Sequence, residues 1–216
     1  TILDAAREVF LLRGAAATTA EVARRAGVSE GSIFKRYRTK HGLLEAVVAD
    51  VEREPAFISE LPARVGAGHV FANLEWLAGE LLEYFRRAAP VHLLAWSAPS
   101  GPRGRVLLSA ASTPLATLRK VAGYFEAEMH LGRIRRADAE VVARSFVGAL
   151  GNFVLLELLA NAPESSPMPE QSYIRGYVAV LARGLEPDAP WPAAEGLDAA
   201  LAGLYEAPLA YVNLGS

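Results

Sequence analysis

Apolar residues recur every three or four positions through most of this chain, the spacing that gathers them on one face of an α-helix. In the first quarter of the sequence this pattern predicts helices over residues 1–13, 18–26, 30–37 and 40 to about 54. Pro55 should end or kink the fourth helix, because a proline ring clashes with the preceding turn. We therefore expect an amino-terminal domain over residues 1–50 and a second domain over residues 51–216.

The second domain is also predicted to be helical. Its expected helices cover residues 69–88, 91–97, 113 to about 131, 138 to about 161 and 170–185, with short helical segments near 105–112 and 195–206. Pro90 is expected to separate the first two, and the stretch from Pro62 to Gly68 to form a break before them. The predicted fold class is therefore all-α.

The helix over residues 138–161 is apolar on nearly every side. A helix without a hydrated face has to be covered all round, which in a small protein usually means a subunit interface. Its densest apolar window, residues 145–160, is shorter than the ~18 residues needed to span a bilayer and contains Asn152 and Glu157. We therefore expect a contact with a second subunit and no membrane segment.

Residues 27–44 read GVSEGSIFKRYRTKHGLL and carry the signals of two short helices that meet at a turn, followed by the start of a third. Gly27 can adopt the positive φ that ends one helix, and Ser29 and Thr39 can cap the next two. Four cations lie close together here, namely Lys35, Arg36, Arg38 and Lys40. A basic short helix after a tight turn from another helix is the helix-turn-helix arrangement, which places its second helix in the DNA major groove.

The pattern Gly-Val-Ser-x-Gly-Ser-Ile-Phe-x-x-Tyr-x-x-Lys-x-x-Leu-Leu from Gly27 to Leu44, with its lead-in over residues 18–26, closely resembles the DNA-binding signature of the TetR (tetracycline-repressor-type) family. The resemblance implies an N-terminal three-helix helix-turn-helix domain and a C-terminal helical ligand-binding and dimerisation domain. It places the base- and phosphate-contacting positions on Glu30, Gly31, Ser32, Phe34, Lys35, Arg36, Tyr37 and Lys40. Thr19, in the first turn of the preceding helix, can reach a phosphate with its hydroxyl and N–H or can simply cap the helix.

Several of these contact positions depart from the commonest family pattern. Phe34 replaces a frequent Tyr and loses a hydroxyl that can bind phosphate, while Lys35 and Arg36 replace an aromatic–His pair. An arginine there is suited to bidentate pairing with guanine, and Ser32 is small enough to touch a base edge. Phe34 and Tyr37 also fit as core residues of a three-helix domain, so both interpretations stay open.

The charge distribution fits a protein that touches DNA with one end. The formal net charge is −2, but residues 1–45 carry eight Lys and Arg against five Asp and Glu, which leaves the remainder at −5. There is no cysteine, which excludes disulfides and thiolate metal sites and fits a reducing cytoplasm. Charged residues in the first turns argue against a signal peptide, so a cytoplasmic location is expected.

No catalytic chemistry is evident. The HExxH motif and the P-loop are missing, and the four histidines lie on separate predicted elements. Glu126 and Glu128 are two residues apart, so they should point to different faces of their helix. We expect neither an enzyme nor a cofactor.

The second domain holds bulky and polar groups on helices that would surround an interior. They are Trp76, Tyr84, His92, Trp96, Tyr124, Phe125, Met129, Phe146, Asn152, Phe153 and Glu157. Taken singly they fit ordinary core; taken together, because the resemblance implies a pocket, we expect them to line a largely apolar effector site. Asn152 and Glu157 would be its polar anchors, because a polar group on a buried helix needs a partner.

The resemblance thus implies a homodimeric, ligand-responsive regulator, in this family most often a repressor, that pairs through helices 138–161 and 170–185. It would bind a near-palindromic double-stranded operator and release it when a small molecule tilts the helix that begins at Lys40. Two rivals remain: a small-molecule-binding protein or enzyme that no longer binds DNA, and a non-specific architectural DNA binder.

Overall fold

The computed structural model describes residues 1–97, 113–159 and 168–185, and every regular element in these ranges is helical. The predicted all-α class is therefore confirmed. The amino-terminal part contains α1 (Ile2–Arg13), a short 3₁₀ turn η1 (Gly14–Ala16), α2 (Thr19–Ala26), α3 (Glu30–Tyr37) and α4 (Lys40–Val51). The body contains α5 (Ala56–Arg64), α6 (Val70–Ser97), α7 (Thr113–His130), α8 (Ala139–Leu159) and α9 (Glu170–Leu185).

The helices of the head, as we call residues 1–51, begin and end at the predicted signals. The Thr18 hydroxyl accepts from the N–H of Glu21 in a capping box, and the Ser29 and Thr39 hydroxyls cap α3 and α4. Gly27 ends α2 in the left-handed region at φ 69°, where a side chain would be strained. These caps satisfy backbone groups that a helix end leaves without partners.

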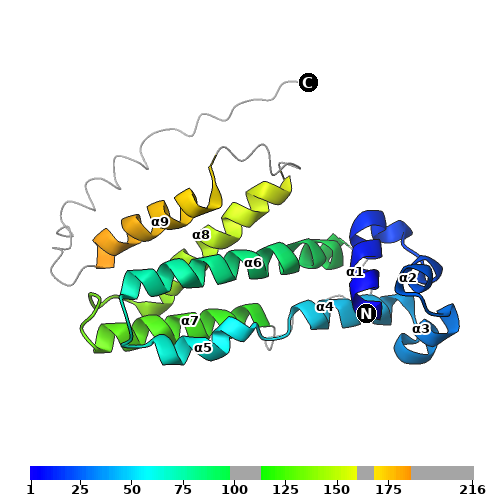
Figure 1. Cartoon of the computed structure of the whole chain (residues 1–216), viewed down its shortest axis with the longest axis horizontal. Helices are drawn as coiled ribbons and strands as arrows, with labels where there is room; N and C mark the ends of the chain where they lie inside the picture. The colour runs from blue at the N-terminus through cyan, green and yellow to red at the C-terminus, as the bar shows by residue number, and fades with distance from the viewer. Residues whose placement is uncertain (98–112, 160–167, 186–216) are drawn as a thin grey trace, which may run out of the picture.

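One apolar core holds the head together. Phe10 of α1, Val22 of α2, Ile33 of α3 and Leu43 and Val47 of α4 are all buried in it. Burying a side chain as large as Phe10 or Ile33 stabilises the fold by roughly 1.5–3 kcal/mol. Because α1 contacts α2, α4 and α6, the head is also joined to the body (Figure 1).

The body is a layered bundle with α6 in its middle. α6 packs on α4 and α5 on one side and on α8 and α9 on another, while α7 packs on α5 and α8 (Figure 1). The core residues that these helices share include Leu74, Leu77, Leu81, Val121, Phe125, Phe146, Leu150, Val154, Ile174 and Val178. The division of the chain at residues 50 and 51 stays a prediction, since α4 ends at Val51 but α6 reaches α1.

Two predictions for the body are wrong. Pro90 does not separate two helices, because α6 runs from Val70 to Ser97 through it. The loss of one backbone hydrogen bond there is offset by packing, since Ala88 and Val91 on either side are buried. Residues 56–64, for which no helix was expected, form α5, which contains Pro62 and buries Phe57, Ile58 and Leu61.

The other predicted helices agree with the structure. Asp138 caps α8, its Oδ1 accepting from the N–H groups of Glu140 at 2.9 Å and Val141 at 3.1 Å. α9 covers the predicted 170–185 range, and α7 starts at the predicted Thr113. The helical segments expected near 105–112 and 195–206 and the last residues of the 138–161 helix lie outside the described residues.

One described helix, α8, is long and apolar enough by composition to cross a membrane, with a mean hydropathy of 1.6 over 18 residues. The prediction concerned runs of apolar residues, and every 18-residue stretch of α8 includes Arg144, so the prediction is not contradicted. Core helices pass the same test, and α8 buries Val142, Phe146, Leu150 and Val154 on one side. Only 28% of the window is buried within the single chain, so the rest of its apolar surface still needs an explanation.

Candidate nucleic-acid interface and effector region

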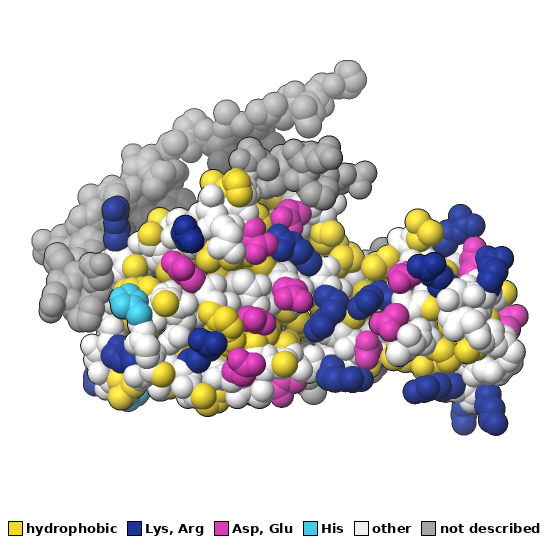
Figure 2. Space-filling model, viewed as in Figure 1, with side chains coloured by type: hydrophobic (Ala, Val, Ile, Leu, Met, Phe, Trp, Pro, Cys, Tyr) yellow, Lys and Arg dark blue, Asp and Glu magenta, His cyan; other side chains and the backbone are white. Residues whose placement is uncertain are grey.

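α3 presents its predicted DNA-contacting residues to solvent. Ile33 is buried beneath the helix, whereas the side of α3 that faces away from the core is exposed, comprising Glu30, Gly31, Ser32, Phe34, Lys35 and Arg36. Figure 2 shows Lys and Arg side chains gathered on the head where Figure 1 places α3. Phe34 is 45% exposed, which removes the interpretation of it as a core residue. The two-residue offset between Ile33 and Lys35 puts the apolar and basic sides on different faces.

Tyr37 and Arg36 close the end of α3. Tyr37 is half-buried against the head core, and the Arg36 guanidinium lies 5.5 Å from the centre of its ring. Tyr37 thus serves both the core and the surface, and the two interpretations of it are compatible. Arg38 follows at φ 63°, a strained conformation for a side chain other than glycine, and turns the chain into α4.

Thr19 and Lys40 bind other parts of the head. Thr19 is buried, and its hydroxyl donates to Glu30 Oε1 at 2.6 Å. The Lys40 ammonium is exposed and donates to the carbonyl oxygen of Ala15 at 2.6 Å. The first turn of α3 is therefore tied to the first turn of α2, and the first turn of α4 to η1.

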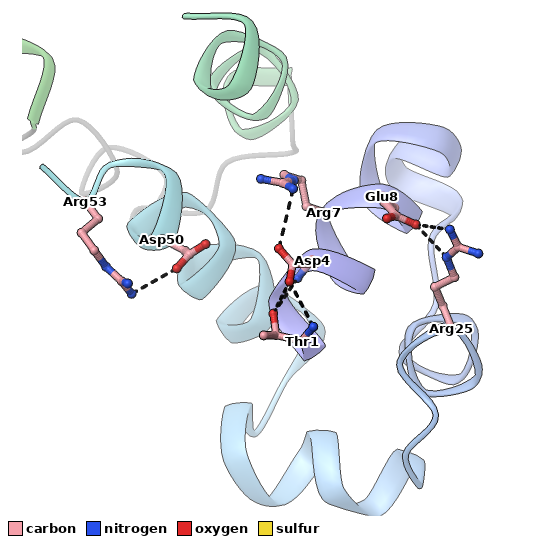
Figure 3. A network of polar contacts seen from close by, with 7 residues as sticks. All are labelled: Thr1, Asp4, Arg7, Glu8, Arg25, Asp50 and Arg53. Atoms are coloured by element: carbon pink, nitrogen blue, oxygen red, sulfur yellow. Dashed lines mark hydrogen bonds and ion pairs between the residues drawn. The ribbon is translucent and has the colours of Figure 1, made fainter. Parts of the chain in front are cut away.

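Ion pairs fix α2 against α1 (Figure 3). In the pair drawn there, the Arg25 guanidinium of α2 donates to Glu8 of α1 at 2.6 Å. A second pair, outside that view, joins Arg13 at the end of α1 to Glu21 at 3.2 Å. The pKa of Glu21 is lowered, mainly by the hydrogen bond that its carboxylate accepts from the Thr18 N–H. Because α1 in turn contacts α4 and α6, these pairs set the position of the α2–α3 unit relative to the body.

Two family models match the chain in sequence. The model for bacterial regulatory proteins of the tetR family matches residues 2–47, which cover the head almost entirely, and the model for the C-terminal domain of AefR-like transcriptional repressors matches residues 105–183. The chain belongs to the TetR family of transcriptional regulators. The predicted helix-turn-helix and the resemblance on residues 18–44 are thereby confirmed.

Individual relatives and solved structures are similar to this chain over most of its length. The uncharacterized HTH-type transcriptional regulator YvkB of Bacillus subtilis (strain 168) is 23% identical over 188 residues, 87% of this chain and 96% of that protein. A proposed TetR-family regulator from Mesorhizobium loti MAFF303099 has a TM-score of 0.69 at 20% identity over 86% of this chain and 95% of its own. FadR from Bacillus subtilis, solved with stearoyl-CoA, has a TM-score of 0.62 at 16% identity, over 83% of this chain and 95% of the FadR chain.

The predicted effector residues of this TetR-family chain do not gather around one cavity in the described part. Trp76 packs edge-on against Phe57, and the Arg64 guanidinium lies 3.5 Å above its ring. Tyr84 is buried, and this burial is the main cause that raises its pKa; the nearby Glu52 carboxylate is the second cause. His92 Nε2 lies 3.4 Å from Glu52 Oε1, next to the end of α4. The side chain of Trp96 lies outside the described residues.

The predicted effector residues of α7 and α8 are mainly core. Phe125 and Phe146 meet edge-on with ring centres 5.8 Å apart, and Met129 is buried beside them on α7. Phe153 stacks on Tyr173 of α9 with ring centres 4.4 Å apart. Burial, followed by the Glu128 carboxylate, raises the pKa of Tyr124 to about 12.

The two expected polar anchors have other surroundings. Glu157 accepts two hydrogen bonds from the Arg86 guanidinium, at 3.0 and 2.9 Å, and Arg86 also binds Glu170. Arg86 therefore joins α6, α8 and α9. Glu157 is already paired with Arg86, so it does not need a bound ligand to neutralise its charge. Asn152 is exposed on α8, so the premise that it lies on a buried face is wrong for the single chain.

A pocket of about 450 Å³ does lie between α5 and α7. Its lining consists of Glu54, Ile58, Ser59, Leu61, Pro62, Val65, Lys120, Gly123 and Tyr124. Lys120 and Glu54 form an ion pair, which links α7 to the segment between α4 and α5. Tyr124 is the one residue of this lining that was among the predicted effector residues, and most of the others lie on or beside α5, where no helix was expected.

Sequence reasoning also missed a buried acid. Glu128 is fully buried; it accepts from the Gly66 N–H at 3.0 Å and pairs with the Arg133 guanidinium at 2.9 Å. Glu126 is exposed, which confirms that the two acids point to different faces. The spacing of Glu128 from Val121 and Phe125 already placed it on the apolar face of α7. In the described part of the chain no group of His, Cys, Asp and Glu is arranged to hold a metal ion.

Proposed function

We propose that this protein is a homodimeric repressor that binds a near-palindromic DNA operator and releases it when a small, largely apolar molecule binds in the body. The observation that carries the proposal is the orientation of α3, which buries Ile33 and turns its cations and small residues outward. TetR-family regulators bind DNA operators as dimers and respond to small-molecule effectors. Such a regulator works where the chromosome is, so we place it in the cytoplasm.

The exposed apolar surface of α8 and α9 supports the dimer. Along these helices the side chains of Val141, Leu155, Leu156, Leu159 and Val180 are exposed. On α8 they follow a stripe with Gly148 and Asn152, and Gly148 and Gly176 have open space around them in the single chain. Two copies of α8 and α9 would cover this surface in a four-helix bundle, which accounts for the apolar character of α8 without a membrane.

The pocket between α5 and α7 supports an effector that is mostly apolar. Ile58, Leu61 and Val65 give it an apolar wall, and Ser59 and Lys120 add polar groups. FadR, which shares this fold, was solved with stearoyl-CoA, a molecule that carries a long hydrocarbon chain. A molecule that entered here would act on Glu54, next to the end of α4, and so on the helix that carries the head.

The test is a fluorescence anisotropy titration of the purified protein against DNA from upstream of its own gene and against random DNA of equal length. We expect much tighter binding to one upstream sequence, by about 10³-fold or more. Replacing Lys40 with Met should weaken binding to all sequences alike and flatten its salt dependence by about one phosphate contact. Equal affinity for both DNAs would favour an architectural binder, and no affinity for either would favour a small-molecule-binding protein.

A further inference from the structure

The hydrogen bond between Thr19 and Glu30 joins two helices at the surface that we propose meets DNA. Thr19 is the first residue of α2 and Glu30 the first residue of α3. Thr19 is only 8% exposed, and its Oγ1 lies 2.6 Å from Glu30 Oε1, whereas Glu30 itself is exposed. One partner is thus fixed in the head core and the other reaches into solvent.

A carboxylate at this place needs a reason, because DNA carries a negative charge on every phosphate. Glu30 is the only acid between Gly27 and Lys40, and its partner within the described residues is the neutral Thr19 hydroxyl. At 4 Å two like charges repel by about 1 kcal/mol in water and by more at a protein surface. An acid that points at phosphates would therefore weaken binding, whereas an acid that points at a hydrogen-bond donor on a base would strengthen it.

The bases limit which donor that can be. In the major groove guanine presents two acceptors and thymine an acceptor and a methyl group, so neither suits a carboxylate. Adenine offers its N6 amino group, but next to the N7 acceptor, which repels a carboxylate oxygen. Cytosine offers the N4 amino group, the usual partner of Glu and Asp in direct readout. Residues at the amino end of a recognition helix are those that reach base edges.

Resting on the proposed function, we infer that Glu30 reads a cytosine amino group in each operator half-site and that Thr19 is the residue that positions its carboxylate. The Thr19 hydroxyl occupies Oε1, and a carboxylate has about four acceptor sites, so Oε2 is left for the base. Holding the side chain in place before binding avoids part of the entropy that a free glutamate would lose. The Thr19 hydroxyl then donates to Glu30, and only the backbone N–H of Thr19 would remain to bind a phosphate.

The experiment begins with selection of operator sequences from a randomised duplex library by the full-length protein. Anisotropy then gives the affinity of the wild type, Glu30→Ala, Glu30→Gln, Thr19→Val and Thr19→Ser for the selected site and for each single-base replacement. We expect the wild type to prefer cytosine at one position in each half-site, and Glu30→Ala to reduce that preference by about 5- to 100-fold. Thr19→Val, which removes the donor but keeps the shape, should reduce it partly at the same position, and Thr19→Ser should retain it.

The outcomes separate the inference from the function on which it rests. If the wild type selects no sequence at all, the proposed function fails. If it selects a site but Glu30→Ala keeps every base preference, or if the affected base is not cytosine, the inference is overturned. A Thr19→Val variant that loses affinity equally for all sequences would also overturn it, because that is the behaviour of a phosphate contact. Glu30→Ala changes an exposed side chain, so this arm of the test does not depend on whether the threonine variants fold.

Discussion

At the scale of single residues, the turn from α3 to α4 is shaped by close backbone contacts. Arg38 has φ 63°, and the Thr39 N–H donates to the Tyr37 carbonyl at 2.7 Å. A Cβ added to Gly42 would lie 2.4 Å from that same carbonyl oxygen, far inside contact distance. Gly42 is therefore needed for α4 to approach the end of the recognition helix, although its own φ is that of an ordinary helix.

Gly42→Ala should destabilise the head. The added methyl group forces the α3–α4 turn apart, so we expect the free energy of unfolding, measured by urea denaturation, to fall by about 1–3 kcal/mol. Gly31→Ala is the matched control, because its Cβ would meet only Ser29 Oγ, at 3.8 Å. Alanine there should raise the stability by about 0.5–1 kcal/mol through its helix propensity. Equal effects of the two changes would show that the turn tolerates a side chain.

At the scale of elements, the body is joined by polar contacts between helices as well as by its core. The Arg86 guanidinium connects α6 to Glu157 on α8 and to Glu170 on α9. Arg135 donates from its backbone N–H to the Leu185 carbonyl at 2.8 Å, which ties the segment before α8 to the end of α9. These contacts fix the helices that we propose form the dimer interface.

Arg86→Met should therefore cost more than the loss of an ordinary surface ion pair. Two carboxylates would lose a charged partner, and we expect the free energy of unfolding to fall by about 1.5–3 kcal/mol. Arg144→Met is the control, because within the described ranges Arg144 pairs only along its own helix, with the exposed Glu140. Such a pair contributes about 0.3–0.5 kcal/mol. Similar losses in both variants would mean that the three-helix contact adds nothing to stability.

The buried Tyr124 on α7 and the half-buried Tyr177 on α9 should make the body sensitive to alkaline pH. Burial raises the pKa of Tyr124 and of Tyr177 to about 12, from 10.0. The folded state keeps these phenols neutral, so their contribution is fully present below pH 10. It is lost as the pH rises towards 12, where the unfolded chain releases protons that the folded chain retains. Helical circular dichroism during denaturation at pH 9–12 should show this loss, and the Tyr124→Phe, Tyr177→Phe double variant should show less of it.

At the scale of the whole molecule, the head lies at one end of an elongated chain, with α8 and α9 on the body (Figure 1). A dimer through α8 and α9 would therefore fix how far apart two heads stand. If the operator half-sites lie one helical turn of DNA apart, about 34–36 Å, the spacing of the heads decides whether both can bind at once. An effector that changes the angle of α4 would then act through this spacing.

Leu156→Arg should break the dimer and, with it, tight operator binding. Leu156 is 57% exposed in the single chain, so a charge costs little in the monomer but would be buried in the proposed interface. Light scattering after size exclusion should show a shift from dimer to monomer, and operator affinity should fall at least tenfold. Leu131→Arg is the control, because Leu131 is similarly exposed, at 56%, but lies beyond the end of α7. A dimer that persists with Leu156→Arg would place the interface elsewhere.

Sequence by itself determined the head. Three helix caps in the head each join a hydroxyl, of Thr18, Ser29 or Thr39, to the backbone N–H three residues later. Gly27 ends α2 because glycine can adopt a positive φ. Residues that are neighbours along the chain therefore decide these features. The exposed faces of α3 follow from helical periodicity for the same reason. The start of α8 at Asp138 was predictable on the same local grounds.

Only the tertiary structure decided the features that depend on distant partners. Arg86 meets Glu157 across 71 positions of sequence and Glu170 across 84, so no local pattern shows that Glu157 is already paired. Pro90 stays within a helix because Ala88 and Val91 are buried against other elements, and packing of that kind outweighs the local preference of proline to end a helix. The Thr19 hydroxyl contacts Glu30 because α2 and α3 pack against each other. Such a contact depends on how two helices pack, so it cannot be inferred from the residues next to Thr19 or Glu30 in the chain.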